Sequence, residues 1–148
     1  MKIYLAVPLQ KNRNNYLATG IYKILKGFGC KILSEWVLWN DPNPNLKPIQ
    51  IYKRDSNAIN SCDVLVADVS NPSIGVGMEI MLAFSLDKKI ICIHKKKNIS
   101  NFLRGMPGVS IISYSTFHEL NEKLRRTIFI INKENPVRLK GTRSAKTR

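Results

Sequence analysis

Five short hydrophobic runs, each rich in valine, isoleucine or leucine, recur along this chain of 148 residues. They occupy residues 3–7, 30–33, 64–69, 90–93 and 109–112. Runs of this kind, without alternating polar positions, are typical of strands that are covered on both faces. Segments with helical periodicity lie between them, so the sequence predicts a doubly wound parallel sheet with helices on both faces. In such a sheet a ligand is expected beyond the carboxyl ends of the strands.

The helical segments carry their apolar residues on one side. The first repeats them at Leu17, Ile21, Leu25 and Phe28, and Gly27 and Gly29 offer a helix stop. The last begins after Ser115 and Thr116, either of which can cap it. Residues 39–48 contain three prolines and three asparagines and should be irregular, either as a flap over a site or as a plain connection.

Positive charge is the unusual bulk property of the chain. Lysine and arginine number 24 against 10 aspartates and glutamates, which gives a formal charge of +14. This charge favours anionic ligands, either phosphorylated small molecules or nucleic acid, without choosing between them. We predict one domain at residues 1–132 and a basic, flexible C-terminal tail at residues 133–148.

Several classes of protein are excluded by composition. No hydrophobic run approaches the roughly 18 residues that a membrane span needs, and no signal peptide opens the chain, so we expect a soluble, cytoplasmic protein without a membrane partner. Cys30, Cys62 and Cys92 are odd in number and widely spaced, which indicates reduced structural thiols. The two histidines lie far apart, and we predict no metal site and no cofactor.

The segment from residue 63 to residue 84 has the clearest chemistry. A predicted buried strand ends at Asp68, a polar turn follows, and a helix then begins near Ser73, Gly75 and Gly77. Glycine backbone, a serine hydroxyl and a helix N-terminus together can hold a phosphate. Gly-x-Gly alone is weak evidence, because the lysine of a P-loop and the third glycine of a dinucleotide site are missing.

Two carboxylates lie near this turn in the predicted fold. Glu79 falls in about the first turn of the predicted helix, where the helix dipole favours the ionised form that a nucleophile needs. Asp55 lies on a predicted helix that begins after Pro48. Each also has a structural interpretation, Glu79 as a helix-start residue that accepts backbone hydrogen bonds and Asp55 as a solvated position. Two carboxylates on either side of a sugar can cleave a glycosidic bond.

A known family shares these motifs. The string Pro-Ser-Ile-Gly-Val-Gly-Met-Glu at residues 72–79 resembles the nucleoside 2-deoxyribosyltransferase superfamily, and most closely its 2'-deoxynucleoside 5'-phosphate N-hydrolase branch. The opening Ile-Tyr-Leu-Ala at residues 3–6 and the serine-containing residues 99–105 also resemble that family. The resemblance implies a flavodoxin-like sheet and a homodimer.

The resemblance also implies a role for each site residue. Glu79 would attack the anomeric carbon, Asp55 would serve as acid/base partner, and Tyr4 would help to place Glu79. Ser73 and the amides around Gly75 and Gly77 would hold the 5'-phosphate. Ser100 would complete this site from the neighbouring subunit. Asp68 stands where the family often has an acid, in either a substrate-binding or a structural role.

Three functions remain open from the sequence. The leading one is hydrolysis of the N-glycosidic bond of (deoxy)nucleoside 5'-monophosphates through a covalent intermediate on Glu79. A deoxyribosyltransferase is the alternative, since residues 7–10, Val-Pro-Leu-Gln, replace the branch's Gly-Ser-Ile-Arg and remove a phosphate-binding arginine. Lys11 and Arg13 are candidates to replace its charge. A non-catalytic nucleotide or nucleic-acid binding module is the third possibility and is not favoured.

Overall fold

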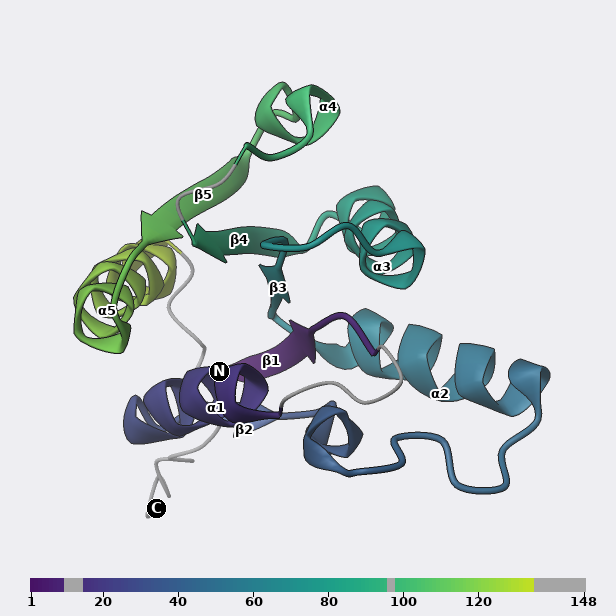
Figure 1. The fold of residues 1–148 in the computed structure, drawn as a ribbon. Coiled ribbons are helices and arrows are strands. Elements are labelled where there is room, and N and C mark those ends of the chain that lie inside the picture. Colours follow the sequence, from purple (N-terminus) through teal and green to yellow (C-terminus); the bar gives the residue numbers. More distant parts are fainter. Residues whose placement is uncertain (10–14, 96–97, 135–148) are drawn as a thin grey trace, which may run out of the picture.

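A central parallel sheet organises the computed structural model, which describes residues 1–9, 15–95 and 98–134. Within these residues the sheet has five strands in the order β2-β1-β3-β4-β5 (Figure 1). The strands are β1 (Lys2–Ala6), β2 (Lys31–Ile32), β3 (Val64–Asp68), β4 (Lys89–Lys95) and β5 (Val109–Tyr114). All four pairings are parallel. The predicted doubly wound sheet is confirmed, and its order is that of the flavodoxin-like fold.

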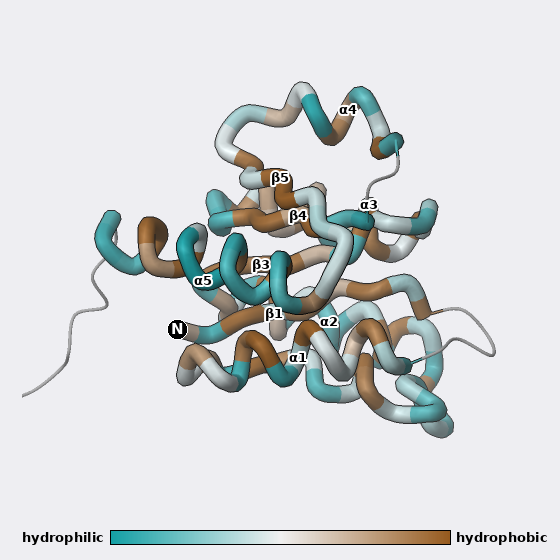
Figure 2. The backbone as a smooth tube through the Cα atoms, turned by 60° about the vertical axis from the view of Figure 1, so that its left-hand side comes forward, coloured by the Kyte–Doolittle hydropathy of each residue, from teal (hydrophilic) through white to brown (hydrophobic). Residues whose placement is uncertain are grey.

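Helices cover both faces of this sheet. The helical elements are α1 (Tyr16–Gly27), the 3-10 turn η1 (Glu35–Leu38), α2 (Pro48–Ser61), α3 (Ile74–Ser85), the short α4 (Asn101–Arg104) and α5 (Phe117–Glu134). Helices α1 and α5 lie on one face, and α2 and α3 lie on the other (Figures 1 and 2). Among the described residues, no helix is both long and apolar enough to cross a bilayer.

Strand β3 explains why the hydrophobic runs show no alternation. Its five residues are all buried. Val64 and Val66 pack in the core beneath α1 and α5, whereas Leu65 and Ala67 pack in the core beneath α2 and α3. Successive side chains point to opposite faces, and both faces are dry, so the first four positions are apolar and only Asp68 at the carboxyl end is polar. Figure 2 shows hydrophobic residues gathered in the central strands.

The helix ends follow their local sequence signals. Gly29 has a φ of 75°, the left-handed conformation that lets the chain leave α1 and enter β2. The Thr116 hydroxyl accepts a hydrogen bond from the Glu119 amide at 3.1 Å and so caps α5. Helix α5 continues to Glu134 and includes the first two residues of the predicted tail. Residues 135–148 lie outside the described part of the chain, as do Lys11 and Arg13.

The three cysteines and the proline-rich segment have the predicted character. Cys30, Cys62 and Cys92 are buried free thiols. Residues 39–47 form turns and bends, and regular structure resumes at Pro48 as the first residue of α2. We call residues 39–45 the proline loop.

Candidate active site

A carboxylate and a phenol meet between β1 and α3. The Tyr4 hydroxyl donates a hydrogen bond to Oε1 of Glu79 at 2.6 Å. Tyr4 projects from β1 toward the face covered by α2 and α3, beside the point where the chain order reverses between β1 and β3. That reversal is where ligands bind in sheets of this type. Glu79 lies in the second turn of α3, one turn later than the sequence suggests.

Burial controls the charge of Glu79. It raises the pKa of this carboxyl to about 7, with the Tyr4 hydrogen bond opposing the rise, Asp55 adding to it and Arg54 opposing it. We expected the helix dipole to hold Glu79 ionised, but that effect fades beyond the first turn. Desolvation dominates instead, so the Glu79 carboxyl changes its charge near pH 7.

Tyr4 remains a hydrogen-bond donor at physiological pH. Burial raises the pKa of its hydroxyl far above the usual range, and the neighbouring Glu79 charge adds to the rise. The ring is 1% exposed and makes an edge-to-face contact with Trp36, with centroids 6.3 Å apart. Packing therefore fixes the phenol beneath Glu79.

Asp55 pairs with its neighbour on α2. Arg54 Nε lies 2.7 Å from Asp55 Oδ1, and the two side chains are only 20% and 18% exposed. The solvated interpretation of Asp55 is therefore wrong in this structure. Asp55 also raises the pKa of both Glu79 and Tyr4, so its charge acts across the space between α2 and α3.

Arg54 is the site residue that our sequence analysis missed, and it packs on Trp36. The Arg54 guanidinium lies over the Trp36 ring, 4.1 Å from its centroid. It also donates to the carbonyl of Pro42 at 2.8 Å and to Oδ1 of Asn43 at 2.9 Å. The sequence offered one signal for it, namely an arginine directly adjacent to a candidate acid.

The proposed phosphate cradle forms the start of α3. Ser73 is the N-cap residue, and its Oγ accepts a hydrogen bond from the Val76 amide at 3.3 Å. Gly75 and Gly77 follow within the helix and are exposed. A Cβ at Gly77 would meet none of the described atoms within 4 Å, and one at Gly75 would meet only Ser73 Oγ at 4.0 Å. Packing within the described chain therefore does not require either glycine.

Asp68 and Ser100 lie apart from these groups. Asp68 is 3% exposed, and its Oδ1 accepts a hydrogen bond from the Ser70 amide at 3.0 Å. It follows Val64 and Val66 in the strand alternation, toward the α1 and α5 face, and this placement favours its structural interpretation. Ser100 precedes α4, which lies beyond β5 and on the opposite side of α3 from α2 (Figures 1 and 2).

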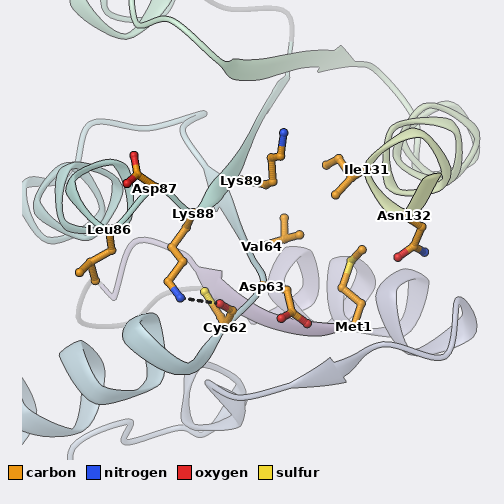
Figure 3. Close-up of a pocket in the computed structure, with 10 residues that line it drawn as sticks. All are labelled: Met1, Cys62, Asp63, Val64, Leu86, Asp87, Lys88, Lys89, Ile131 and Asn132. Atoms are coloured by element: carbon orange, nitrogen blue, oxygen red, sulfur yellow. Dashed lines mark hydrogen bonds between the residues drawn. The ribbon is translucent and has the colours of Figure 1, made fainter. Parts of the chain in front are cut away.

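A separate cavity of about 400 Å³ opens at the amino ends of β1, β3 and β4 (Figure 3). Lys88 reaches across it to the carbonyl oxygen of Cys62 at 3.0 Å. Glu79, Tyr4 and Asp55 do not line this cavity, so it is distinct from the candidate site. Within residues 1–9, 15–95 and 98–134, no three histidine, cysteine, aspartate or glutamate side chains are placed to hold a metal ion.

Comparison with known proteins identifies a family with sequences similar to this one. The family model described as nucleoside 2-deoxyribosyltransferase matches residues 3–124. A protein of Thermofilum pendens, provisionally named 2'-deoxynucleoside 5'-phosphate N-hydrolase 1, is 31% identical over 134 residues, covering 84% of this chain and 92% of that protein. The 5-hydroxymethyl-dUMP N-hydrolase of Danio rerio is 32% identical over 72 residues, or 47% of this chain and 50% of that protein.

A solved structure has the same fold and related chemistry. The CMP N-glycosidase BcmB of Clostridium botulinum superposes with a TM-score of 0.68 at 25% sequence identity. The match covers 85% of this chain and 99% of that one.

Proposed function

This chain belongs to the nucleoside 2-deoxyribosyltransferase family and is an enzyme of N-glycosidic bonds, and we propose that it hydrolyses (deoxy)nucleoside 5'-monophosphates. The products would be a free base and a (deoxy)ribose 5-phosphate. The observation that carries the proposal is the half-buried carboxylate of Glu79, held at 2.6 Å by the Tyr4 hydroxyl. Relatives named for N-hydrolysis of nucleotides support the substrate class.

Glu79 supplies the nucleophile in this proposal. One of its oxygens attacks C1' of the sugar, and the electrons of the breaking C1'–N bond leave with the base. The result is a glycosyl ester on Glu79, which water then hydrolyses. Tyr4 holds Oε1, while Oε2 accepts no hydrogen bond from any residue that the structure describes and is the oxygen available for attack.

Asp55 supplies the acid/base function. In the first step it delivers a proton to the departing base, and in the second it takes a proton from the attacking water. Its electrostatic effect on the pKa of Glu79 supports a position near the same sugar. Oδ1 is engaged by Arg54, and Oδ2 accepts no hydrogen bond within the described residues, so Oδ2 would face the substrate.

The start of α3 would hold the 5'-phosphate. Backbone amides at a helix N-terminus attract an anion, and the Ser73 hydroxyl can donate its hydrogen while its oxygen accepts from Val76. Glycine inside a helix costs about 1 kcal/mol relative to alanine. Gly75 and Gly77 carry that cost without an internal steric reason among the described atoms, which supports close approach by a ligand or a partner.

The pH dependence of activity follows from Glu79. The nucleophile must be ionised, and its pKa is raised to about 7. We expect kcat/KM to rise about tenfold per pH unit on the acid side of that value, which is the acid limb of the rate profile. Tyr4→Phe removes a hydrogen bond that lowers the pKa, so the acid limb should move to higher pH. Rates of base release across pH 5 to 9, measured as kcat/KM, check both expectations.

Tyr22→Phe is the matched control for this profile. The Tyr22 hydroxyl donates to Oε1 of Glu35 at 3.0 Å on an exposed surface of the molecule. The acid limb of the kcat/KM profile of this variant should lie at the same pH as that of the wild type. An acid limb at the same pH in wild type and Tyr4→Phe would contradict the assigned coupling between Tyr4 and Glu79.

The enzyme is proposed to act as a homodimer. Ile74, Met78 and Met81 project from one side of α3 and are 85%, 66% and 43% exposed. An apolar stripe of this kind on a surface helix is typical of a subunit interface. A second copy packed on this stripe would bring its own Ser100 toward the Ser73 cradle, as the family resemblance implies.

Met78→Lys should convert the dimer to monomer, because a charged side chain would be buried without a partner. Light scattering after gel filtration measures the mass. Ile130→Lys is the matched control, since Ile130 is 50% exposed on α5, and it should leave the dimer intact. A wild-type protein that elutes as a monomer at micromolar concentration would contradict the proposal.

The cysteine thiols support a cytoplasmic location. Cys30, Cys62 and Cys92 are free and buried. Reduced thiols are the rule in that compartment, whereas secreted proteins more often pair them.

A panel of nucleotides tests the proposed function. The protein is incubated with the common ribo- and deoxyribonucleoside 5'-monophosphates and the matching nucleosides, and free base is measured by chromatography. We expect base release from at least one monophosphate, with slower release from its nucleoside. The absence of base release from every member of the panel would overturn the proposal.

Base exchange is a second candidate function, favoured by the family model that matches the chain. Residues 7–10 also lack the arginine found in the phosphate-specific branch. In a transferase a second base, rather than water, resolves the glycosyl ester. Addition of a different free base to a reaction with a deoxynucleoside distinguishes the two, because only a transferase forms a new nucleoside.

A further inference from the structure

Arg54 connects the two carboxylates to the proline loop. From the four contacts of its side chain we infer that Arg54 is a positioning residue, which orients Asp55 and anchors residues 39–45 against α2. The inference rests on the proposed function, because it concerns how that same site is held together.

The contact with Asp55 is not an ordinary helix-surface pair. Adjacent residues on a helix point in different directions, and surface ion pairs form between residues three or four apart. Arg54 nevertheless turns back so that its Nε lies 2.7 Å from Asp55 Oδ1. Both side chains are largely shielded from solvent, so the pair is screened less than a surface pair. One oxygen of Asp55 is thereby fixed and the other is left for the substrate.

The remaining nitrogens of Arg54 bind the proline loop. Nη1 donates to the carbonyl of Pro42 and Nη2 donates to Oδ1 of Asn43. These residues lie twelve and eleven positions before Arg54 in the chain, in a segment without regular structure. The planar fork of a guanidinium suits three acceptors in fixed directions, which a lysine ammonium would not reproduce.

Trp36 extends this arrangement toward Glu79. The guanidinium is stacked on the Trp36 ring at 4.1 Å, and Trp36 contacts the edge of Tyr4. Tyr4 in turn holds Glu79. Arg54 therefore touches Asp55 directly and reaches Glu79 through two rings, so that loss of its shape should disturb both carboxylates.

Charge adds a second consequence. The groups that act on the pKa of Glu79 are Tyr4 from β1 and Asp55 and Arg54 from α2. Among these three groups, Arg54 is the one that carries a positive charge, and it lowers the pKa of Glu79. A neutral residue at position 54 should therefore move the acid limb of the rate profile to higher pH, and a lysine should keep much of the electrostatic effect.

Two substitutions separate shape from charge. Arg54→Lys keeps the charge and loses the fork, and Arg54→Met loses both. We expect kcat to fall roughly 10- to 100-fold in each, as when partners that orient metal ligands are removed, with a smaller change in KM. Arg54→Met alone should move the acid limb upward. Lys53→Met, at an exposed neighbouring position, is the matched control and should change neither quantity.

A measurement without substrate makes the test independent of catalysis. The chain has two tryptophans, so Trp39→Phe leaves Trp36 as the single reporter. In that background Arg54→Met should increase quenching of Trp36 fluorescence by acrylamide, because the stacked guanidinium is gone. Asn43→Ala, which removes one loop contact only, should lower kcat several-fold without moving the acid limb and serves if Arg54→Met does not fold.

The outcomes separate this inference from the proposed function. If the wild-type protein releases no base, the proposed function fails, and the fluorescence result alone decides whether Arg54 shields Trp36. If the wild type is active and Arg54→Met or Arg54→Lys has wild-type kcat, the positioning role is overturned. Wild-type quenching of Trp36 in Arg54→Met would overturn the assigned contact itself.

Discussion

Glu79→Gln should lower kcat by a factor on the order of 10⁴, comparable to the loss of a nucleophile in other covalent enzymes. The amide cannot form the glycosyl ester, yet it keeps the size of the side chain and can still accept the Tyr4 hydrogen bond. Folding should therefore be preserved. Base release under saturating nucleotide, followed over hours to resolve the slow variant, measures the effect.

Glu122→Gln provides the matched control for that substitution. Glu122 is on α5 with a side chain that is 71% exposed, far from the face that carries Tyr4. Its rate should equal that of the wild type. Wild-type turnover by Glu79→Gln itself would eliminate a carboxylate nucleophile at position 79.

Asp55→Asn should reduce kcat by about 10²- to 10⁴-fold, the usual range for loss of a general acid or base. The deficit should depend on the departing base. A nucleotide whose base leaves readily without protonation should be cleaved at a rate closer to that of the wild type, because proton delivery then matters less. Glu79→Gln should lack this dependence, since it blocks attack on every substrate.

Parallel assays with one poor and one good leaving group measure this difference. Asp87→Asn is the control, because Asp87 is exposed and its positive φ of 53° is one that asparagine also adopts. An equal loss for both substrates in Asp55→Asn would contradict the acid role.

The fold could be predicted from the sequence because the central strands are covered on both faces. In β3, Val64 through Asp68 are all buried. In a chain that alternates helices and strands, a hydrophobic run of this kind indicates a strand of a parallel sheet. Strand ends were less clear. The run at residues 30–33 forms a two-residue strand, because β2 is an edge strand that pairs only with β1.

The site could be predicted only in part. Glu79 and Ser73 lie within one continuous motif, and Tyr4 and Asp55 came from the family resemblance and from charge. Arg54 was missed because its partners, Pro42 and Asn43, reach it only through an irregular loop whose course no periodicity encodes. The ionisation of Glu79 was also misjudged, since burial depends on tertiary packing that the helix position does not reveal.

A covalent adduct on Glu79 is the most direct test of the mechanism. The enzyme is mixed with a cleavable nucleotide, quenched in acid within milliseconds to seconds, and digested for mass spectrometry. We predict that the peptide containing Glu79 gains the mass of the sugar phosphate minus one water, and that Glu79→Gln shows no such gain. Rapid base release by the wild type, with the adduct absent at every quench time or found on another residue, would contradict the account.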